Sequence, residues 1–229
     1  MTGYLGSKAG AGAYQAIISL MPPHDTYIET HLGSGAVMLR KPPAVKSIGI
    51  DLDATAVNQF KKSLASESFQ GNIELINTNA HEFLADYPFM GNELVYADPP
   101  YLLDTRTSNK RYRHEYTEND HVELLSIIKR LKCSVILSGY PSKLYDKTLS
   151  GWNTKEFQSM TRGGVRTEKL WFNYDHDAAY WASFAGNNFT DRQRIKRKAQ
   201  RWAKNYIDLP PGERRAILAA LMDAEGDPA

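Results

Sequence analysis

Short runs of β-branched and aromatic residues alternate with longer segments of helical spacing through the middle of the chain. The segments Ala54 to Ser66 and Glu118 to Leu131 carry apolar residues at the spacing of one helix face. Thr117 precedes the second as an N-cap, with Asp120 placed to complete a capping box. Strand, helix and strand in succession predict an α/β fold, a mostly parallel seven-stranded sheet with helices on both faces. The predicted strands are Thr26 to Thr30, Lys46 to Ile50, Ile73 to Thr78, Glu93 to Ala97, Ser134 to Ser138, Lys155 to Ser159 and Glu168 to Tyr174.

The pattern changes after Phe184. From Asp191 to Tyr206, an apolar stripe recurs at helical spacing while basic residues fill the other faces, which predicts an amphipathic basic helix. The stripe consists of Ile195, Ala199, Trp202 and Tyr206. Pro210-Pro211-Gly212 ends this helix, and a second, apolar helix is predicted from Glu213 to Ala224. We therefore expect a domain of residues 1–184 and a C-terminal helical hairpin in residues 185–229.

Length and composition fit one globular domain with a small appendage. The 229 residues are 42% hydrophobic and 24% charged, which excludes a fibrous or wholly disordered protein. The longest apolar run, Ala216 to Met222, is far shorter than the roughly 20 residues that cross a bilayer. We expect a soluble cytoplasmic protein. The single cysteine, Cys133, precedes a predicted strand and is interpreted as a small core residue, and the histidine spacing predicts no metal site.

Positive charge is concentrated in two segments. The net charge is only +2, yet residues 192–204 hold seven Lys or Arg and residues 106–114 hold four, and neither segment contains an acid. The rest of the chain is therefore acidic. Two basic segments on an acidic body are typical of a protein that binds a polyanion, although each segment alone also fits an ordinary solvated surface.

A glycine pair follows the first predicted strand. Gly33 and Gly35 form a G-x-G turn, where missing side chains let a ligand approach the backbone at the carboxyl end of the strand. Met38 stands where a dinucleotide fingerprint has its third glycine, so a tight strand-to-helix turn is an equal alternative.

An acid ends the second predicted strand. Asp51 comes about 20 residues after the glycine turn, the position from which a carboxylate accepts hydrogen bonds from ribose hydroxyls. It therefore points to an adenosine-containing cofactor. The alternative is that Asp51 or Asp53 caps the following helix.

The strongest signal is Asp98-Pro99-Pro100-Tyr101, directly after a predicted buried strand. The two prolines remove backbone donors and leave the Pro99 carbonyl available as an acceptor. An exocyclic amino group on a base is a poor nucleophile because its lone pair is delocalised into the ring. Two acceptors on its hydrogens favour the pyramidal form that attacks, and Tyr101 is placed to stack on a base that has left the helix.

Together these motifs resemble the Dam-type family of DNA adenine N6-methyltransferases, which use S-adenosylmethionine. That family begins with an aromatic residue followed four places later by a lysine, and this chain has Tyr4 and Lys8. The resemblance covers about residues 1–175 and implies a Rossmann-like methyltransferase fold. It implies that Asp98 to Tyr101 hold the target adenine. It implies cofactor contacts from Tyr4, Lys8, Gly33, Gly35, Asp51, Asn79 and Asp98.

Several positions depart from the family pattern. Thr30 and His31 replace the usual Pro-Phe, and Asn79 stands where an acid commonly receives the cofactor's adenine amine, although an amide oxygen can accept the same bond. The segment between Asp51 and Asp98 is too short for the family's target-recognition domain. We expect a short basic insert near residues 102–117 to replace it, and the basic C-terminal helix to clamp the DNA backbone. The expected nucleic-acid contacts are Arg106, Lys110, Arg111, Arg113, Arg192, Lys196, Arg197 and Lys198.

The interpretation that follows is a DNA adenine N6-methyltransferase acting on a flipped adenine in duplex DNA. The alternatives are an RNA adenine N6-methyltransferase and a nucleic-acid-binding protein that keeps the fold without catalysis. The family is common in bacteria and their phages, so the resemblance implies a bacterial or phage-infected cell, with protection in restriction-modification or regulation as open roles. Tyr140, after the fifth predicted strand, is an even choice between substrate contact and packing.

Overall fold

The structure is a computed structural model that describes residues 7–10, 12–66, 71–106, 113–161, 164–176 and 181–226. The chain divides into two compact units, Met1–Phe184 and Ala185–Ala229, and each is described by itself. Tyr4, Lys110 and Arg111, three of the expected contact residues, lie outside the described residues.

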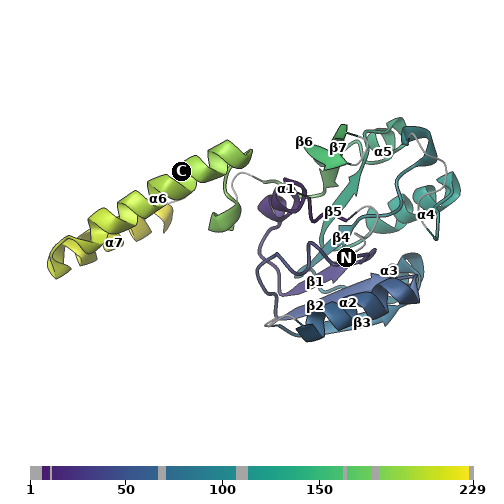
Figure 1. Cartoon of the computed structure of the whole chain (residues 1–229), viewed down its shortest axis with the longest axis horizontal. Coiled ribbons are helices and arrows are strands. Elements are labelled where there is room, and N and C mark those ends of the chain that lie inside the picture. The colour runs from purple at the N-terminus through teal and green to yellow at the C-terminus, as the bar shows by residue number, and fades with distance from the viewer. Residues whose placement is uncertain are drawn as a thin grey trace. The chain divides into compact units, whose positions relative to one another are not determined.

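In the described part of unit 1, seven strands form one sheet in the order β3-β2-β1-β4-β5-β7-β6 (Figure 1). The strands β1 to β5 run parallel to one another. Strand β7 is antiparallel to both β5 and β6. This confirms the predicted α/β fold with a mostly parallel sheet. The strands are β1 (Thr26–Glu29), β2 (Lys46–Asp51), β3 (Ile73–Asn77), β4 (Glu93–Ala97), β5 (Ser134–Gly139), β6 (Asn153–Thr161) and β7 (Gly164–Phe172).

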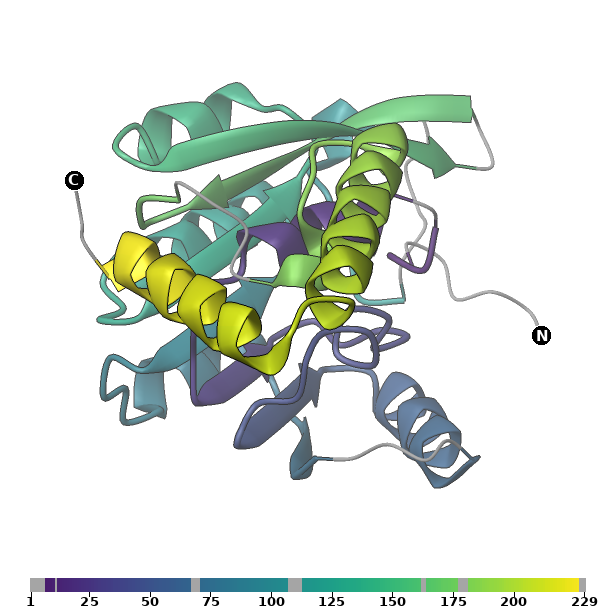
Figure 2. The same ribbon diagram turned by 90° about the vertical axis from the view of Figure 1, so that its left-hand side faces the viewer.

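Helices pack on both faces of this sheet (Figures 1 and 2). One buried cluster joins α1 (Ala13–Leu20) and α2 (Ala54–Ser66) to side chains such as Tyr96. The cluster on the other face joins α3 (Ala80–Asp86), α4 (Glu118–Ile128) and α5 (Lys143–Thr148) to the alternate strand positions. Cys133 belongs to this second cluster, which confirms it as a core residue. Because side chains alternate across a strand, each central strand contributes to both cores.

Local sequence explains where the longer helices begin. Thr117 and Asp120 form the predicted capping box, in which Asp120 Oδ2 accepts from the Thr117 amide at 2.7 Å. The helix ends at Ile128, three residues before the predicted end, because residues 129–131 already turn toward β5. Two short 3₁₀ helices, η1 (Leu103–Thr105) and η2 (Ala182–Phe184), complete the described helices of unit 1.

Unit 2 is a pair of consecutive helices, α6 (Phe189–Ile207) and α7 (Pro211–Gly226), joined by a short turn (Figure 2). The Asn188 side chain caps α6 by accepting from the Asp191 amide at 2.9 Å. Tyr206 links the two helices by donating to the Arg214 carbonyl at 2.9 Å. The predicted helical hairpin is therefore present. Among the described helices, none combines the length and apolar character that a bilayer crossing needs.

Candidate active site

A cavity of about 330 Å³ opens at the carboxyl ends of β1, β2 and β4. Its volume is at the small end of the ~300–1,000 Å³ typical of small-molecule sites. It lies at the edge of the sheet where a doubly wound fold binds its ligand. Several of the predicted cofactor residues line it, namely Lys8, Gly33, Asp51, Asn79 and Asp98.

The glycine turn forms one wall of the cavity. Gly33 and Gly35 have φ angles of 51° and 60°, a region in which a side chain is strained. A Cβ on Gly35 would also overlap the Phe60 ring. In the described residues 31–45 the chain continues in turns rather than in a regular helix, so the alternative of a simple strand-to-helix turn is wrong.

Asp51 faces the glycine turn across the cavity. Its Oδ2 accepts from the Gly33 amide and its Oδ1 from the Asp53 amide, each at 2.8 Å. Burial raises the pKa of Asp51, while these two amides act in the opposite direction. The capping role falls to Asp53, whose side chain accepts from the Thr55 amide at 2.8 Å at the start of α2. Each Asp51 oxygen has a second lone pair, so the carboxylate suits a pair of ribose hydroxyls.

Asn79 lines the cavity from the start of α3. Its Oδ1 caps this helix by accepting from the His81 amide at 2.8 Å. The amide oxygen is therefore fixed in position, and its second lone pair suits a hydrogen bond from an amino group. A role in capping and a role in binding are compatible here.

Lys8 contacts the predicted catalytic acid directly. Its ammonium lies 2.8 Å from Asp98 Oδ1 and 2.7 Å from Oδ2, and both side chains are largely buried. Burial alone would lower the pKa of Lys8, but the carboxylates of Asp98 and Glu168 raise it well above its usual value. Lys8 also lines the cavity, so the same residue borders the expected cofactor region and the acid.

Ser138 is a site residue that the sequence reasoning missed. It is the next-to-last residue of β5 and donates to Asp98 Oδ1 at 2.5 Å, while Tyr96 Oη lies 3.2 Å from its hydroxyl. A carboxylate has about four lone-pair positions. Among the described residues, Asp98 Oδ1 accepts from Lys8 and Ser138, and Oδ2 accepts from Lys8. The remaining acceptor position is on Oδ2.

Tyr101 is buried, with 6% of its surface exposed. Its hydroxyl donates to Glu168 at 2.6 Å, and the Lys8 ammonium lies 4.9 Å from its ring centre. The Tyr140 ring packs edge-on against it at 4.7 Å, so Tyr140 reaches the predicted substrate side. Pro100 lines the cavity, and Pro99 is buried beside it.

Two arginines of the expected recognition insert have acidic partners within unit 1. Arg106 is buried, and its Nη2 lies 2.6 Å from a Glu115 oxygen. Arg113 lies 3.1 Å from Asp53 and donates to the Thr55 hydroxyl at 2.8 Å, and it lines the cavity. The end of the insert thus borders the expected cofactor region. It is held there by the contact between Arg113 and Asp53, which are 60 residues apart in the sequence.

Tyr116 fixes the end of this insert among histidines. Its hydroxyl lies 2.9 Å from His31 Nε2, and the rings of His81 and His121 pack against it at 5.3 and 5.4 Å. Burial lowers the pKa of His31 to about 3 and that of His121 to about 4. Both are therefore neutral at pH 7. The His31 that departs from the family pattern thus has a defined partner.

Glu29, the last residue of β1, lines the cavity and is a second site residue that the sequence reasoning missed. Burial raises the pKa of its carboxyl to about 8, although the Tyr27 hydroxyl donates to it at 2.9 Å. Its Oε2 also accepts from the Met38 amide at 3.1 Å. The sequence signal that could have found Glu29 is an acid at the end of an otherwise largely apolar strand. Through its bond to Met38, Glu29 holds the loop after the glycine turn.

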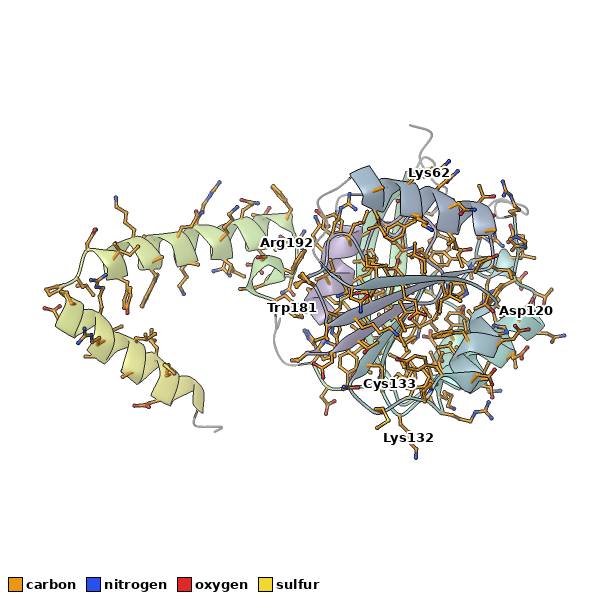
Figure 3. The ribbon with its side chains drawn as sticks, turned by 90° about the horizontal axis from the view of Figure 1, so that it is seen from below. Lys62, Asp120, Lys132, Cys133, Trp181 and Arg192 are labelled. Carbon is orange, nitrogen blue, oxygen red and sulfur yellow. The ribbon has the colours of Figure 1, made fainter. Side chains whose placement is uncertain are left out.

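The basic residues of α6 belong to unit 2 and are not part of this cavity. Lys196, Arg197 and Lys198 are exposed, and Arg192, labelled in Figure 3, is partly buried near the start of the helix. The side chains of α6 and α7 stand apart from one another, in contrast to the dense interior of unit 1 (Figure 3).

The fold and the site define an α/β methyltransferase with a strand-end cavity and an Asp-Pro-Pro-Tyr motif. The family model of the D12 class N6 adenine-specific DNA methyltransferases matches residues 52–167, and the chain belongs to this family. This confirms the resemblance drawn from the sequence. The methyl donor is S-adenosylmethionine, and the geometry of the Asp51 carboxylate and the open glycine turn fits its adenosine part.

No curated protein matches the chain. Among solved structures, the chain is similar to an rRNA methylase from Streptococcus thermophilus, with 12% identity and a TM-score of 0.47, over 71% of this chain and 95% of that one. It is also similar to precorrin 8w decarboxylase from Methanobacterium thermoautotrophicum, with 14% identity and a TM-score of 0.48, over 75% of this chain and 97% of that one.

Proposed function

We propose that the protein methylates the N6 amino group of an adenine flipped out of duplex DNA. The observation that supports this best is the remaining acceptor position of Asp98, on Oδ2 at the wall of the cavity. An adenine amine has two hydrogens, and one of them can be donated to this oxygen. Because the Asp98 side chain is only 15% exposed, a base inside a duplex cannot reach it and must leave the stack.

The Pro99 carbonyl is the second acceptor in this proposal. It follows Asp98 in an extended segment that two prolines keep rigid. With one hydrogen on Asp98 Oδ2 and the other on Pro99, the amine lone pair is directed out of the ring plane. When bound, S-adenosylmethionine supplies an electrophilic methyl group for this lone pair. After transfer the nitrogen loses one proton, and Asp98 Oδ2 is placed to receive it.

The other site residues have binding roles in the proposal. Asp51 holds the ribose of the cofactor, and Asn79 accepts from its adenine amine. Because Gly33 and Gly35 have no side chains, the cofactor can approach the backbone of the turn. Tyr101 borders the target base. Lys8 orients the Asp98 carboxylate, because the ammonium contacts both of its oxygens. Tyr4 remains an expected cofactor contact.

Nucleic-acid binding is assigned to the exposed cations of α6 and to the basic insert. The helix carries Arg192, Lys196, Arg197 and Lys198 within two turns, and no acid interrupts them. Cations on phosphates release counterions and bind without regard to sequence. Base recognition would then fall to the insert, which includes Arg106, Lys110, Arg111 and Arg113.

The test is transfer of a tritiated methyl group from S-adenosylmethionine to unmethylated duplex DNA, followed by nucleoside analysis. We expect the label in N6-methyladenine and expect Asp98→Ala to reduce transfer by at least a thousandfold. Exposed Asp86, the last residue of α3 and outside the motif and the insert, gives the matched control Asp86→Ala, which should retain full activity. Thermal unfolding of both variants checks that they fold.

The substrate class is tested in the same assay by adding structured RNA as a competitor. Label recovered in RNA and not in DNA would replace the DNA substrate by an RNA substrate. Cofactor binding without label in either polymer would contradict methyl transfer to nucleic acid altogether. Near-normal activity of Asp98→Ala would remove Asp98 from its assigned role.

A further inference from the structure

A buried carboxylate on β7 lies next to the Asp-Pro-Pro-Tyr motif. Glu168 is 6% exposed, accepts from the Tyr101 hydroxyl at 2.6 Å and lies 3.7 Å from the Lys8 ammonium. None of the motifs in the sequence includes it. It reaches the site because β7 pairs with β5 in the antiparallel direction, so residues near the start of β7 lie at the end of the sheet where β5 ends.

Charge explains why these groups stay together. Lys8 is a single buried cation between two carboxylates, Asp98 and Glu168, and a buried ion without a partner is strongly destabilising. Burial alone would raise the pKa of Glu168, but the Lys8 ammonium and the hydroxyl donors around it lower that pKa below its usual value. Glu168 is therefore ionised beside the Lys8 ammonium.

Glu168 thus contacts two residues that themselves border the reacting groups. Tyr101 has its ring fixed through the hydroxyl at its far end, and Lys8 has its ammonium shared between the two acids. If Glu168 were absent, the Tyr101 hydroxyl would lose a buried acceptor, and Lys8 would pair with Asp98 alone. The first change frees the Tyr101 ring that borders the target base, and the second changes the position of Lys8 against Asp98, the acceptor of the target amine.

We propose that Glu168 is a positioning residue of the methyltransferase site, holding Tyr101 and Lys8 so that Asp98 and the Tyr101 ring meet the target base in one geometry. This rests on the proposed transfer to an amine bound at Asp98. Glu168 touches neither the base nor the methyl donor in this role. Its effect on rate comes entirely through the two side chains that it holds.

Three substitutions separate its two contacts. Glu168→Gln keeps an oxygen acceptor for Tyr101 but removes the charge that faces Lys8. Tyr101→Phe keeps the ring but removes the hydroxyl. Glu168→Ala removes both contacts. Exposed Glu156 on the neighbouring strand β6 gives the matched control Glu156→Gln, which removes a carboxylate from the same sheet edge outside the site.

The measurements are the single-turnover rate of methyl transfer at saturating DNA and the binding stoichiometry and Kd of S-adenosylmethionine. A displacement of about 1 Å in a reacting geometry can cost about a hundredfold in rate. We expect Glu168→Ala to slow transfer by about a hundredfold and Tyr101→Phe by about tenfold, with full cofactor stoichiometry in both. Glu168→Gln should be faster than Glu168→Ala, because it recovers most of the rate that is lost when Tyr101 has no acceptor.

The double variant Tyr101→Phe with Glu168→Ala completes a mutant cycle, and Glu168→Gln keeps the proposal testable if the alanine variants do not fold. We expect its loss to be at least threefold smaller than the product of the two single losses, because the two residues share one hydrogen bond. Rates within twofold of wild type in both Glu168 variants would overturn the proposal, as would strictly multiplicative losses in the cycle. Loss of cofactor stoichiometry in step with the rate would mean a purely structural role.

Failure of the proposed function would look different. A wild-type protein that transfers no label to nucleic acid contradicts the adenine substrate before any variant is compared. A wild-type protein that methylates adenine, with Glu168 variants equally fast, contradicts only the role of Glu168.

Discussion

The two basic segments of this chain are both dense in Lys and Arg, but their surroundings differ. In residues 106–114, Arg106 is buried against Glu115, and Arg113 lies against Asp53. In residues 192–204, Lys196, Arg197 and Lys198 are exposed on α6, and the ion pair described on that helix joins Arg194 to Asp191 three residues away. The first segment is partly neutralised by unit 1. The second keeps most of its charge toward solvent.

This difference shows what a run of positive residues can and cannot indicate. The sequence gives the sign and density of charge, but the acid that pairs with a cation can come from elsewhere. Glu115 follows the first segment directly, whereas Asp53 precedes Arg113 by 60 residues. Of the two segments, α6 is therefore the better candidate for a counterion-releasing contact with phosphates.

The largest effect that separates the segments is expected from Arg106→Met. The Arg106 side chain is 4% exposed and Glu115 is 23% exposed, so the substitution removes the guanidinium that faces a largely buried carboxylate. We expect the free energy of unfolding to fall by about 3 kcal/mol, at the low end for a broken buried pair. Urea unfolding measures it.

The matched control is Arg194→Met in the exposed pair of α6, which should change stability by less than about 0.5 kcal/mol. Adding Glu115→Leu to Arg106→Met should restore much of the loss, because the carboxylate that faced Arg106 is then gone as well. Equal effects of Arg106→Met and Arg194→Met would mean that the two segments do not differ as described.

The next effect is a dependence on pH near the first segment. Burial lowers the pKa of His121, which packs against Tyr116 and bonds Tyr145, from 6.5 to about 4. The folded state therefore binds fewer protons than the unfolded state between these values. The stabilisation is complete above pH 6.5 and is lost as the pH falls toward 4. At 1.4 kcal/mol per unit, His121 accounts for about 2 kcal/mol lost between pH 6.5 and 5.

Urea unfolding at pH 7, 6 and 5 measures this loss, and His121→Gln should reduce it by the share of His121, leaving the share of buried His31. Residues 189–207 of α6 contain no histidine, so the charge of that helix is constant over the same range. A pH dependence that is unchanged in His121→Gln would assign the titration to another group.

The smallest effect in free energy is expected on α6. Replacing Arg192, Lys196, Arg197 and Lys198 by alanine removes up to four phosphate contacts. The slope of log K against log salt should fall by up to about 3.6, and DNA affinity by about tenfold, which is about 1.4 kcal/mol. Stability should be unchanged. An unchanged salt slope would exclude α6 from the DNA interface.

Much of the fold follows from the sequence because its long elements have clear periods. All seven strands are found near their predicted positions, and β4 and α2 have the predicted bounds. Strand β6 is longer at both ends than predicted, and β7 begins four residues and ends two residues before its predicted bounds. The helices α1, α3 and α5 were missed for physical reasons. Helix α1 is apolar on most sides because it is largely buried, and α3 and α5 have only seven and six residues, too few to show a period.

The site residues that belong to short motifs at strand ends were predictable from the sequence. Gly33, Asp51 and Asp98 each sit at the end of a strand, and the fold brings such ends together. Ser138 and Glu168 also contact the motif, but each is an ordinary residue in its own strand. Their roles depend on which strands are neighbours and on the reversed direction of β7, and the spacing of residues along the chain does not reveal either.

The reversed strand β7 also bears on the order in which the protein is made and folded. Lys8 is synthesised near the beginning of unit 1, and its second counter-charge, Glu168, near the end. Contacts between such distant positions form late, because a long loop must close first. A nascent chain halted before β7 would contain the whole Asp-Pro-Pro-Tyr motif and yet lack the acceptor of its tyrosine. Since Tyr101 donates to Glu168, the hydrogen bonds of the motif are complete only once β7 has joined the sheet.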